Sequence, residues 1–133
     1  MRELLSSTAI PAPKFRYTPC VKAGSHYTVS GMVALDPATG TLVQGGVAAQ
    51  MRRIMDNLVA AMPDYGVDLT HMVLARIYTV EFAEFSEINA VWEQYFVDIP
   101  PPARTSLGVS ALPLGALVEV EFAFYRPDPG DAT

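Results

Sequence analysis

One arginine and two glutamates in the last third of the chain are the side chains best suited to chemistry. Arg104 follows three consecutive prolines, residues 100–102, which stiffen the approaching backbone and limit the entropy lost in positioning the arginine. A guanidinium can bind a carboxylate or phosphate through two parallel hydrogen bonds, which a lysine cannot do. An ordinary ion pair with Glu119 or Glu121 is the structural alternative, and the residue types alone favour it.

Glu119 and Glu121 lie two residues apart, so in a strand they would share one face and repel each other. Such a pair can hold one carboxyl partly protonated, which suits general acid–base catalysis. Two solvated glutamates on an exposed face are the commoner arrangement for this pattern. Both interpretations stay open at this level.

The remaining candidates for chemistry are few. Cys20 and His26 have no recognised spacing for a nucleophile and its base, and Cys20 is expected to be a small buried hydrophobe. His71 is expected on the surface. With two histidines and one cysteine in all, we predict no metal site. No glycine pattern matches a phosphate-binding or dinucleotide-binding loop, and no cofactor is expected.

Composition bounds the class of protein. The chain has 133 residues, which fits one domain, and it is 50% hydrophobic and only 17% charged, which excludes intrinsic disorder. This low charge hints that part of the surface is covered by another copy. Fourteen acidic and nine basic residues give a net charge of −5, and no three basic residues are consecutive. Nucleic acids and anionic membranes are therefore disfavoured as partners.

The single cysteine excludes an internal disulfide and favours a reducing compartment. The first residues lack the apolar stretch of a secretory signal, and no apolar run is long enough to span a bilayer. These features predict a cytoplasmic protein.

Two amphipathic helices are the clearest elements of the sequence. Apolar side chains recur at three- and four-residue steps in both segments. The first stripe contains Val47, Met51, Ile54, Met55, Leu58, Val59 and Met62, and the second contains Phe85, Ile88, Val91, Trp92, Tyr95 and Phe96. Pro63 is expected to end or kink the first helix, and the proline run at 100–102 ends the second.

Strands fill most of the remaining chain. We predict strands at 26–30, 72–80, 105–109 and 118–125, and a turn at 36–40 that leads into a further strand. The resulting order is β-β-β-α-β-α-β-β, an α+β fold in which both helices cover one face of a mixed sheet. We assign the whole chain, residues 1–133, to one domain, with loose termini at 1–13 and 127–133.

The alternation of the last two strands predicts one polar surface. If these strands are neighbours in the sheet, their apolar sides lie under the helices. The opposite face would then gather Arg104, Ser106 and Gly108 with Glu119 and Glu121. A guanidinium beside carboxylates on one sheet face is a candidate site.

The particular residues along the chain resemble the RidA/YjgF family of reactive-intermediate (enamine/imine) deaminases. The matching positions follow the family's order and spacing from about Tyr17 to Phe124: Tyr17; Thr28-Val29-Ser30-Gly31; Asp36 with Thr39-Gly40; Gln50; Asn57-Leu58; Phe85; Asn89; Trp92; Tyr95-Phe96; Pro102-Ala103-Arg104; Leu112-Pro113; and Ala116 to Glu121. The most specific part is the Pro-Ala-Arg segment, which the first glutamate of Val-Glu-Val-Glu follows fifteen residues later.

This resemblance implies a chorismate-mutase-like fold and a homotrimer with three pockets between subunits. It implies that Arg104 binds the carboxylate of a 2-imino or 2-enamino acid and that Glu119 positions or activates water. Ammonia and a 2-keto acid would leave, without a metal or a cofactor. The other pocket residues, some supplied by the neighbouring subunit, would be Tyr17, Ser30, Gly31, Asn89 and Ser106.

Three departures from the family pattern point to a variant subgroup. Phe15-Arg16 replaces the usual Gly-Pro before Tyr17, Met32 replaces a glutamine, and Ser106 replaces a cysteine. A larger or differently charged imino acid would fit these changes, and so would a non-catalytic trimer that binds a small carboxylate. RNA cleavage, a label that some family members carry, is disfavoured by the acidic charge balance.

Overall fold

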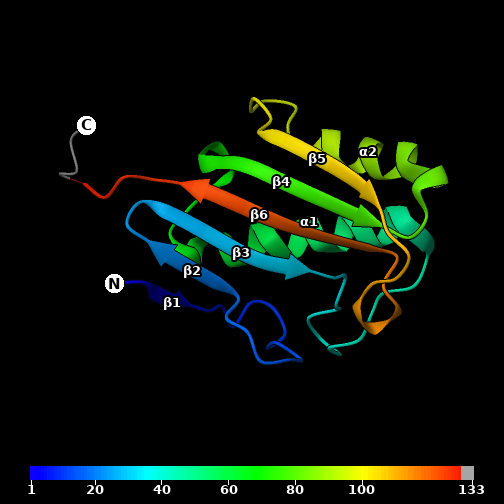
Figure 1. Ribbon diagram of the computed structural model, residues 1–133, viewed down its shortest axis with the longest axis horizontal. Helices are drawn as coiled ribbons and strands as arrows, with labels where there is room; N and C mark the ends of the chain where they lie inside the picture. The colour runs from blue at the N-terminus through cyan, green and yellow to red at the C-terminus, as the bar shows by residue number, and fades with distance from the viewer. Residues whose placement is uncertain (130–133) are drawn as a thin grey trace.

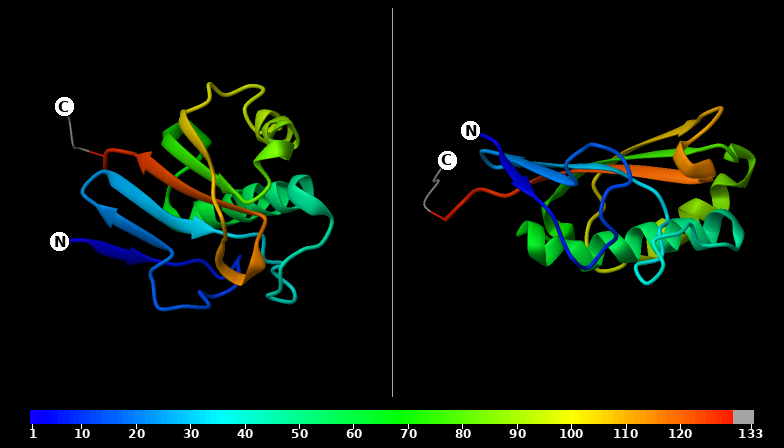
Figure 2. Two further views of the ribbon diagram at one scale, coloured as in Figure 1. Left: turned by 45° about the vertical axis from the view of Figure 1, so that its right-hand side comes forward. Right: turned by 90° about the horizontal axis from the view of Figure 1, so that it is seen from below.

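Two helices cover one face of a six-stranded sheet in the computed structural model, which describes residues 1–129 (Figures 1 and 2). The strands are β1 (Glu3–Leu5), β2 (Cys20–Ala23), β3 (His26–Met32), β4 (Met72–Thr79), β5 (Ala103–Gly108) and β6 (Val118–Tyr125). The helices are α1 (Gly46–Tyr65) and α2 (Phe85–Gln94), with short 3-10 turns η1 (Leu69–His71), η2 (Phe82–Glu84) and η3 (Pro113–Gly115). The predicted α+β class is confirmed.

The sheet has the order β1-β2-β3-β6-β4-β5, and only the β4–β5 pair is parallel (Figure 1). Our expectation that the last two strands are neighbours is wrong, because β4 lies between them. Parallel strands need a crossover connection, and α2 supplies it between β4 and β5. The next strand, β6, then pairs antiparallel with the other side of β4.

The expected strand after the 36–40 turn does not form. Only an isolated bridge joins Leu35 to Leu42, and α1 begins soon afterwards at Gly46. The three strands that precede α1 are instead β1, β2 and β3. Of the 13 residues that we assigned to a loose start, Glu3–Leu5 pair with β2. The expected loose end at 127–133 lies partly outside the described residues.

The core lies between the two helices and the covered face of the sheet (Figure 2, right). Helix α1 runs past Pro63 to Tyr65 and ends at Gly66, whose φ of 83° is in the left-handed region that glycine tolerates. Pro63 therefore does not end the helix, which continues for two more residues. The largest fully buried side chains include Phe122, Phe124, Met51, Ile54, Met55, Leu58, Ile77 and Ile88.

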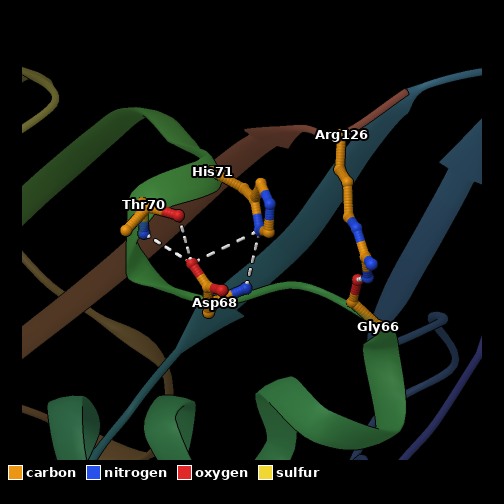
Figure 3. Close-up of polar contacts among 5 residues, drawn as sticks. All are labelled: Gly66, Asp68, Thr70, His71 and Arg126. Atoms are coloured by element: carbon orange, nitrogen blue, oxygen red, sulfur yellow. Dashed lines mark hydrogen bonds and ion pairs between the residues drawn. The ribbon is translucent and has the colours of Figure 1, made fainter. Parts of the chain in front are cut away.

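A polar cluster closes the connection from α1 to β4 (Figure 3). The Asp68 carboxylate accepts hydrogen bonds from the Thr70 backbone N–H at 2.8 Å and the Thr70 hydroxyl at 2.5 Å. In return, Nδ1 of His71 accepts the Asp68 backbone N–H at 3.0 Å. The Arg126 guanidinium donates to the carbonyl of Gly66. These contacts join the end of α1 to the start of β4 and to the segment that follows β6.

No helix in the described part of the chain is both long enough and apolar enough to cross a membrane.

The capping contacts of Asp68 give a stability prediction. We expect Asp68→Ala to lower the free energy of unfolding by about 1 kcal/mol, because it leaves the first N–H groups of η1 without an acceptor. The Thr70 hydroxyl lowers the pKa of Asp68, so this stabilisation is present above the ordinary aspartate pKa and is lost as the pH falls through the lowered value. Chemical denaturation at neutral and acidic pH measures both effects. Asp98→Ala, at an exposed aspartate after α2, is the control.

Candidate functional site

A β-bulge in β3 shapes the first half of the candidate site. Val29 is opposite Phe122 on β6 whereas Met32 is opposite Val120, so β3 has one more residue than its partner between these pairs. Ser30 is held by its backbone N–H to the Pro19 carbonyl at 2.9 Å and by its hydroxyl to the Thr18 carbonyl at 2.6 Å. Bulges of this kind redirect side chains next to binding sites.

Beside this bulge lies a cavity of about 310 Å³. Its walls come from the loop before β2, the end of β3, the η3 turn and the start of β6. The lining residues are Lys14, Phe15, Tyr17, Ser30, Gly31, Val33, Leu35, Pro113, Leu114 and Glu119. Four of the residues that the sequence singled out, Tyr17, Ser30, Gly31 and Glu119, are thus brought together from three distant segments.

Gly31 allows the Glu119 carboxylate to lie close to the backbone of β3. A Cβ added at Gly31 would be 2.7 Å from Oε2 of Glu119 and 2.9 Å from its Cδ, which is too close for any real contact. Any larger residue at this position would therefore displace the carboxylate. Glycine is required here for space, because its φ lies outside the left-handed region.

The environment of the cavity perturbs two of its titratable groups. Burial raises the pKa of Glu119, and the nearby charge of Glu121 raises it further. Burial also raises the pKa of Tyr17, with a second contribution from Glu119. A half-buried carboxylate with a raised pKa beside a cavity fits proton transfer near neutral pH.

The two glutamates of β6 have different surroundings. Their spacing in the sequence did not predict this difference. The Glu121 carboxylate accepts a hydrogen bond from the Tyr78 hydroxyl at 2.5 Å and lies 3.3 Å from Nη1 of Arg76. Within residues 1–129, no side chain forms a hydrogen bond or ion pair with the Glu119 carboxylate. Glu121 is therefore bound into a structural network, while Glu119 is available to a ligand.

Arg104 forms the second half of the candidate site, on the edge strand β5. Its Nη1 donates to Oδ1 of Asn89 at 2.9 Å, and Nδ2 of Asn89 in turn donates to Glu93 at 2.9 Å. The guanidinium carbon lies 5.4 Å from the ring centroids of both Phe85 and Trp92. Helix α2 thus supplies every contact that orients the arginine, and cation–π attraction adds to the hydrogen bond.

Burial lowers the pKa of Arg104, and the charge of Glu93 partly offsets this effect. An arginine remains protonated at any physiological pH, so the side chain offers a fixed positive charge. One of its five N–H groups is occupied by Asn89. The others can bind an oxyanion.

The two halves lie on opposite faces of the sheet, which corrects our prediction of one polar face. In the parallel pairing, Arg104 and Ser106 are opposite Ala75 and Ile77, which are fully buried under the helices. Glu119 is opposite Tyr78 on the uncovered face. The prediction failed because it assigned the apolar side of β5 to the covered face, whereas Leu107 lies opposite Tyr78 on the uncovered face and is 44% exposed.

The sequence did not predict that Lys14 lines the cavity. It also did not predict that Phe85, Trp92 and Glu93 lie near Arg104. The helical stripe assigned both aromatic residues to the core, and they are indeed mostly buried while also contacting Arg104. Spacing of four residues between Asn89 and Glu93 was the available signal, since such residues are neighbours on a helix.

The described residues offer neither a metal site nor a reactive thiol. Within the 129 described residues, no group of three or more His, Cys, Asp and Glu side chains is arranged to hold a metal ion. Cys20 is fully buried, and burial raises its pKa to about 11, so its thiolate form is disfavoured.

Comparisons with known proteins place these features in a family context. The sequence model described as Endoribonuclease L-PSP matches residues 7–125. Protein DfrA of Myxococcus xanthus is 43% identical over 101 residues, which cover 76% of each chain. A 2-iminobutanoate/2-iminopropanoate deaminase of Bos taurus is 35% identical over 121 residues, covering 91% of this chain and 88% of that protein.

Solved structures agree with the sequence matches. YyfA from Yersinia pestis, a Rid-family protein of unknown function, superposes with a TM-score of 0.90 at 27% identity over 95% of this chain and 100% of its own. RidA from an Antarctic Psychrobacter superposes with a TM-score of 0.87 at 29% identity over 93% of this chain and 99% of its own. The described fold therefore recurs in these proteins along nearly its whole length.

The raised pKa of Glu119 gives a prediction for stability. A carboxyl whose pKa is higher in the folded than in the unfolded chain makes stability fall as the pH rises through the window between the two values. We expect Glu119→Gln to raise Tm at about pH 7 and to have little effect at about pH 3, where the glutamate is protonated in both states. Calorimetry at the two pH values measures this. The exposed Glu3→Gln is the control; equal shifts at both pH values would contradict the prediction.

Proposed function

Because this chain belongs to the Endoribonuclease L-PSP family, which contains imine deaminases similar to it, we propose that it hydrolyses reactive 2-imino or 2-enamino acids. The products would be 2-keto acids and ammonia. One observation carries the proposal: the unpartnered carboxylate of Glu119 lines a cavity, while a preoriented Arg104 is available to bind an acid. The family relationship and these two side chains support the same chemistry.

Imine hydrolysis makes modest demands on a protein. The carbon of a protonated imine is already electrophilic, so a water molecule can add to it directly. One C–O bond forms, the C–N bond then breaks, and the iminium and water yield a keto acid and an ammonium ion. The protein must hold the carboxylate, place the water and accept or return a proton.

Glu119 is the group we assign to the water. As a carboxylate it can accept a proton from the attacking water, and as a carboxylic acid it can return that proton to the departing nitrogen. Its raised pKa brings these two forms closer in free energy at neutral pH. Tyr17 and Ser30 line the same cavity and can hydrogen-bond to the substrate.

Arg104 is the group we assign to the substrate carboxylate. The flanking rings of Phe85 and Trp92 and the hydrogen bond to Asn89 restrict the plane of the guanidinium before any ligand arrives. Less conformational entropy is then lost on binding. Ser106 lies two residues along the same strand and on the same face, so it can add a contact to the same acid.

A second copy of the chain would unite the two halves. Within one chain Arg104 and Glu119 face opposite sides of the sheet, so the arginine of one subunit would have to meet the cavity of the next. Such a head-to-tail interface closes into a ring, and the family resemblance favours a ring of three. The uncovered sheet face, where Leu107 is 44% exposed, supports burial against another copy.

Ligand binding without turnover is the alternative function, and the departures from the family pattern at Arg16, Met32 and Ser106 favour it. A protein of this kind would be stabilised by 2-keto acids and would leave imines unchanged. Cleavage of RNA has less support. The chain has a net charge of −5, and no histidine is among the residues that line the cavity.

The deaminase assay is the direct test. An amino-acid dehydratase or oxidase generates the imine, and the rate of keto-acid formation is measured with and without this protein. We expect acceleration, and we expect Arg104→Ala to lower kcat/KM by about 100-fold, since hydrogen bonds to charged groups contribute roughly 1.5–3 kcal/mol. Arg104→Lys keeps the charge and should rescue only part of this loss. The exposed Arg2→Ala is the control; full activity in Arg104→Ala would refute the assignment.

Mixing two inactive variants tests whether the site is shared. Arg104→Ala and Glu119→Gln, unfolded together and refolded as mixed oligomers, should recover about one quarter of native activity, because one quarter of the interfaces would join an intact arginine to an intact glutamate. Light scattering should give a mass three times 14.4 kDa. Each variant refolded alone is the control. A site contained in one chain would recover no activity on mixing.

A further inference from the structure

Lys14 is among the residues that line the cavity of Glu119, and the proposed mechanism assigns no role to its positive charge. It lies on the loop before β2, together with Phe15 and Tyr17, and all three line the cavity. Its ammonium group lies over the 36–40 turn, where a Cβ added at Gly40 would be 3.4 Å from Nζ. Within residues 1–129, no carboxylate lies within ion-pair distance of it.

The cavity is larger than a three- or four-carbon imino acid requires. Its volume of about 310 Å³ is near the lower end of the range, about 300–1,000 Å³, in which proteins bind drug-sized ligands. Leu114 on η3 and Phe15 on the loop supply apolar walls, and they are 44% and 59% exposed in the single chain. This lining suits a substrate whose side chain extends by two or more carbons.

Leu114 occupies this wall in a strained conformation. Its φ of 61° makes it the one non-glycine residue with a positive φ among residues 1–129. A leucine in the left-handed region costs free energy, and such strain is commonly found at ligand sites. Leu114 therefore lines the cavity in a backbone conformation that is unfavourable for leucine.

The distribution of charge indicates what the end of that side chain should carry. If Arg104 of a neighbouring copy binds the 2-carboxylate, the positive charge of Lys14 remains for a second anionic group. Lys14 is exposed whereas Glu119 is half-buried, so the ammonium lies nearer to solvent than the group assigned to the water. A terminal carboxylate at Lys14 and a reacting carbon near Glu119 would place the methylene groups between Phe15 and Leu114.

We propose that the preferred substrates are dicarboxylic 2-imino acids, such as those derived from aspartate or glutamate, whose side-chain carboxylate binds Lys14. This inference rests on the proposed deaminase function and specifies its substrate class. The hydrolysis itself is unchanged: the 2-imino group and one water give the 2-keto group and an ammonium ion, while the second carboxylate serves only recognition.

Binding of product acids tests this substrate class without turnover. The probes are 2-oxoglutarate and 2-oxopentanoate, which have five carbons each and differ by a terminal carboxylate in place of a methyl group. Calorimetric titration of the native protein at low ionic strength should show tighter binding of 2-oxoglutarate. The preference should fall by about two- to fivefold in Lys14→Met, and added salt should weaken it, because the pair is solvent-exposed. Lys14→Arg should retain most of the preference.

Lys22→Met is the matched control, since it removes the same charge from β2, outside the cavity, where Lys22 pairs with Asp128 at 2.8 Å. It should leave the preference unchanged. Equal affinities of the native protein for the two keto acids would overturn the inference. A preference for 2-oxoglutarate that survives in Lys14→Met would overturn it as well.

Turnover separates this inference from the proposed function. The imines of glutamate and of 2-aminopentanoate, generated by an amino-acid oxidase, should be hydrolysed with a kcat/KM ratio that favours glutamate and that falls by a similar factor in Lys14→Met. Hydrolysis of both imines without such a ratio would refute the substrate class and leave the deaminase function standing. Hydrolysis of neither, with a binding preference that follows Lys14, would refute the deaminase function and support dicarboxylate recognition.

Discussion

The pairing of β4 with β5 on one side and with β6 on the other determines which face of the sheet carries each candidate catalytic group. The parallel pairing with β5 places Arg104 opposite Ala75 and therefore on the helix-covered face, where Phe85, Asn89 and Trp92 of α2 contact it. The antiparallel register of β6 with β4 places Glu119 opposite Tyr78, on the uncovered face. Within one chain, Arg104 and the cavity lined by Glu119 therefore lie on opposite sides of the sheet.

The surroundings of Arg104 and of Glu119 are both built from the helices and strands that form the fold itself. The aromatic stripe of α2 fills the core, and two of its rings, those of Phe85 and Trp92, also flank the guanidinium. On the other face, one additional residue in β3 and the absence of a side chain at Gly31 make room for Glu119. Glu121, two residues further on, is bound by Tyr78 and Arg76. Two glutamates on the same face of β6 therefore differ in whether their carboxylates are already hydrogen-bonded within the chain.

Local patterns were sufficient to predict most of the secondary structure. The apolar spacing of three and four residues located α1 and α2, and alternation supported β5 and β6, because these periods are properties of neighbouring residues. Residue composition between turns and helices located β3 and β4. The same patterns could not locate β1 and β2, which are short and follow no alternation of their own. Their pairing depends on residues far along the chain.

The sequence by itself determined the α+β class, the two helices, the family and four of the residues that line the cavity. Only the tertiary structure decided which of those residues meet: Tyr17, Ser30, Gly31 and Glu119 share a cavity, whereas Arg104 and Asn89 lie across the sheet from it. The physical reason is that the period of a strand specifies which side chains share a face, but strand order and register specify which face that is. Order and register arise from contacts between distant segments, which one sequence pattern does not contain.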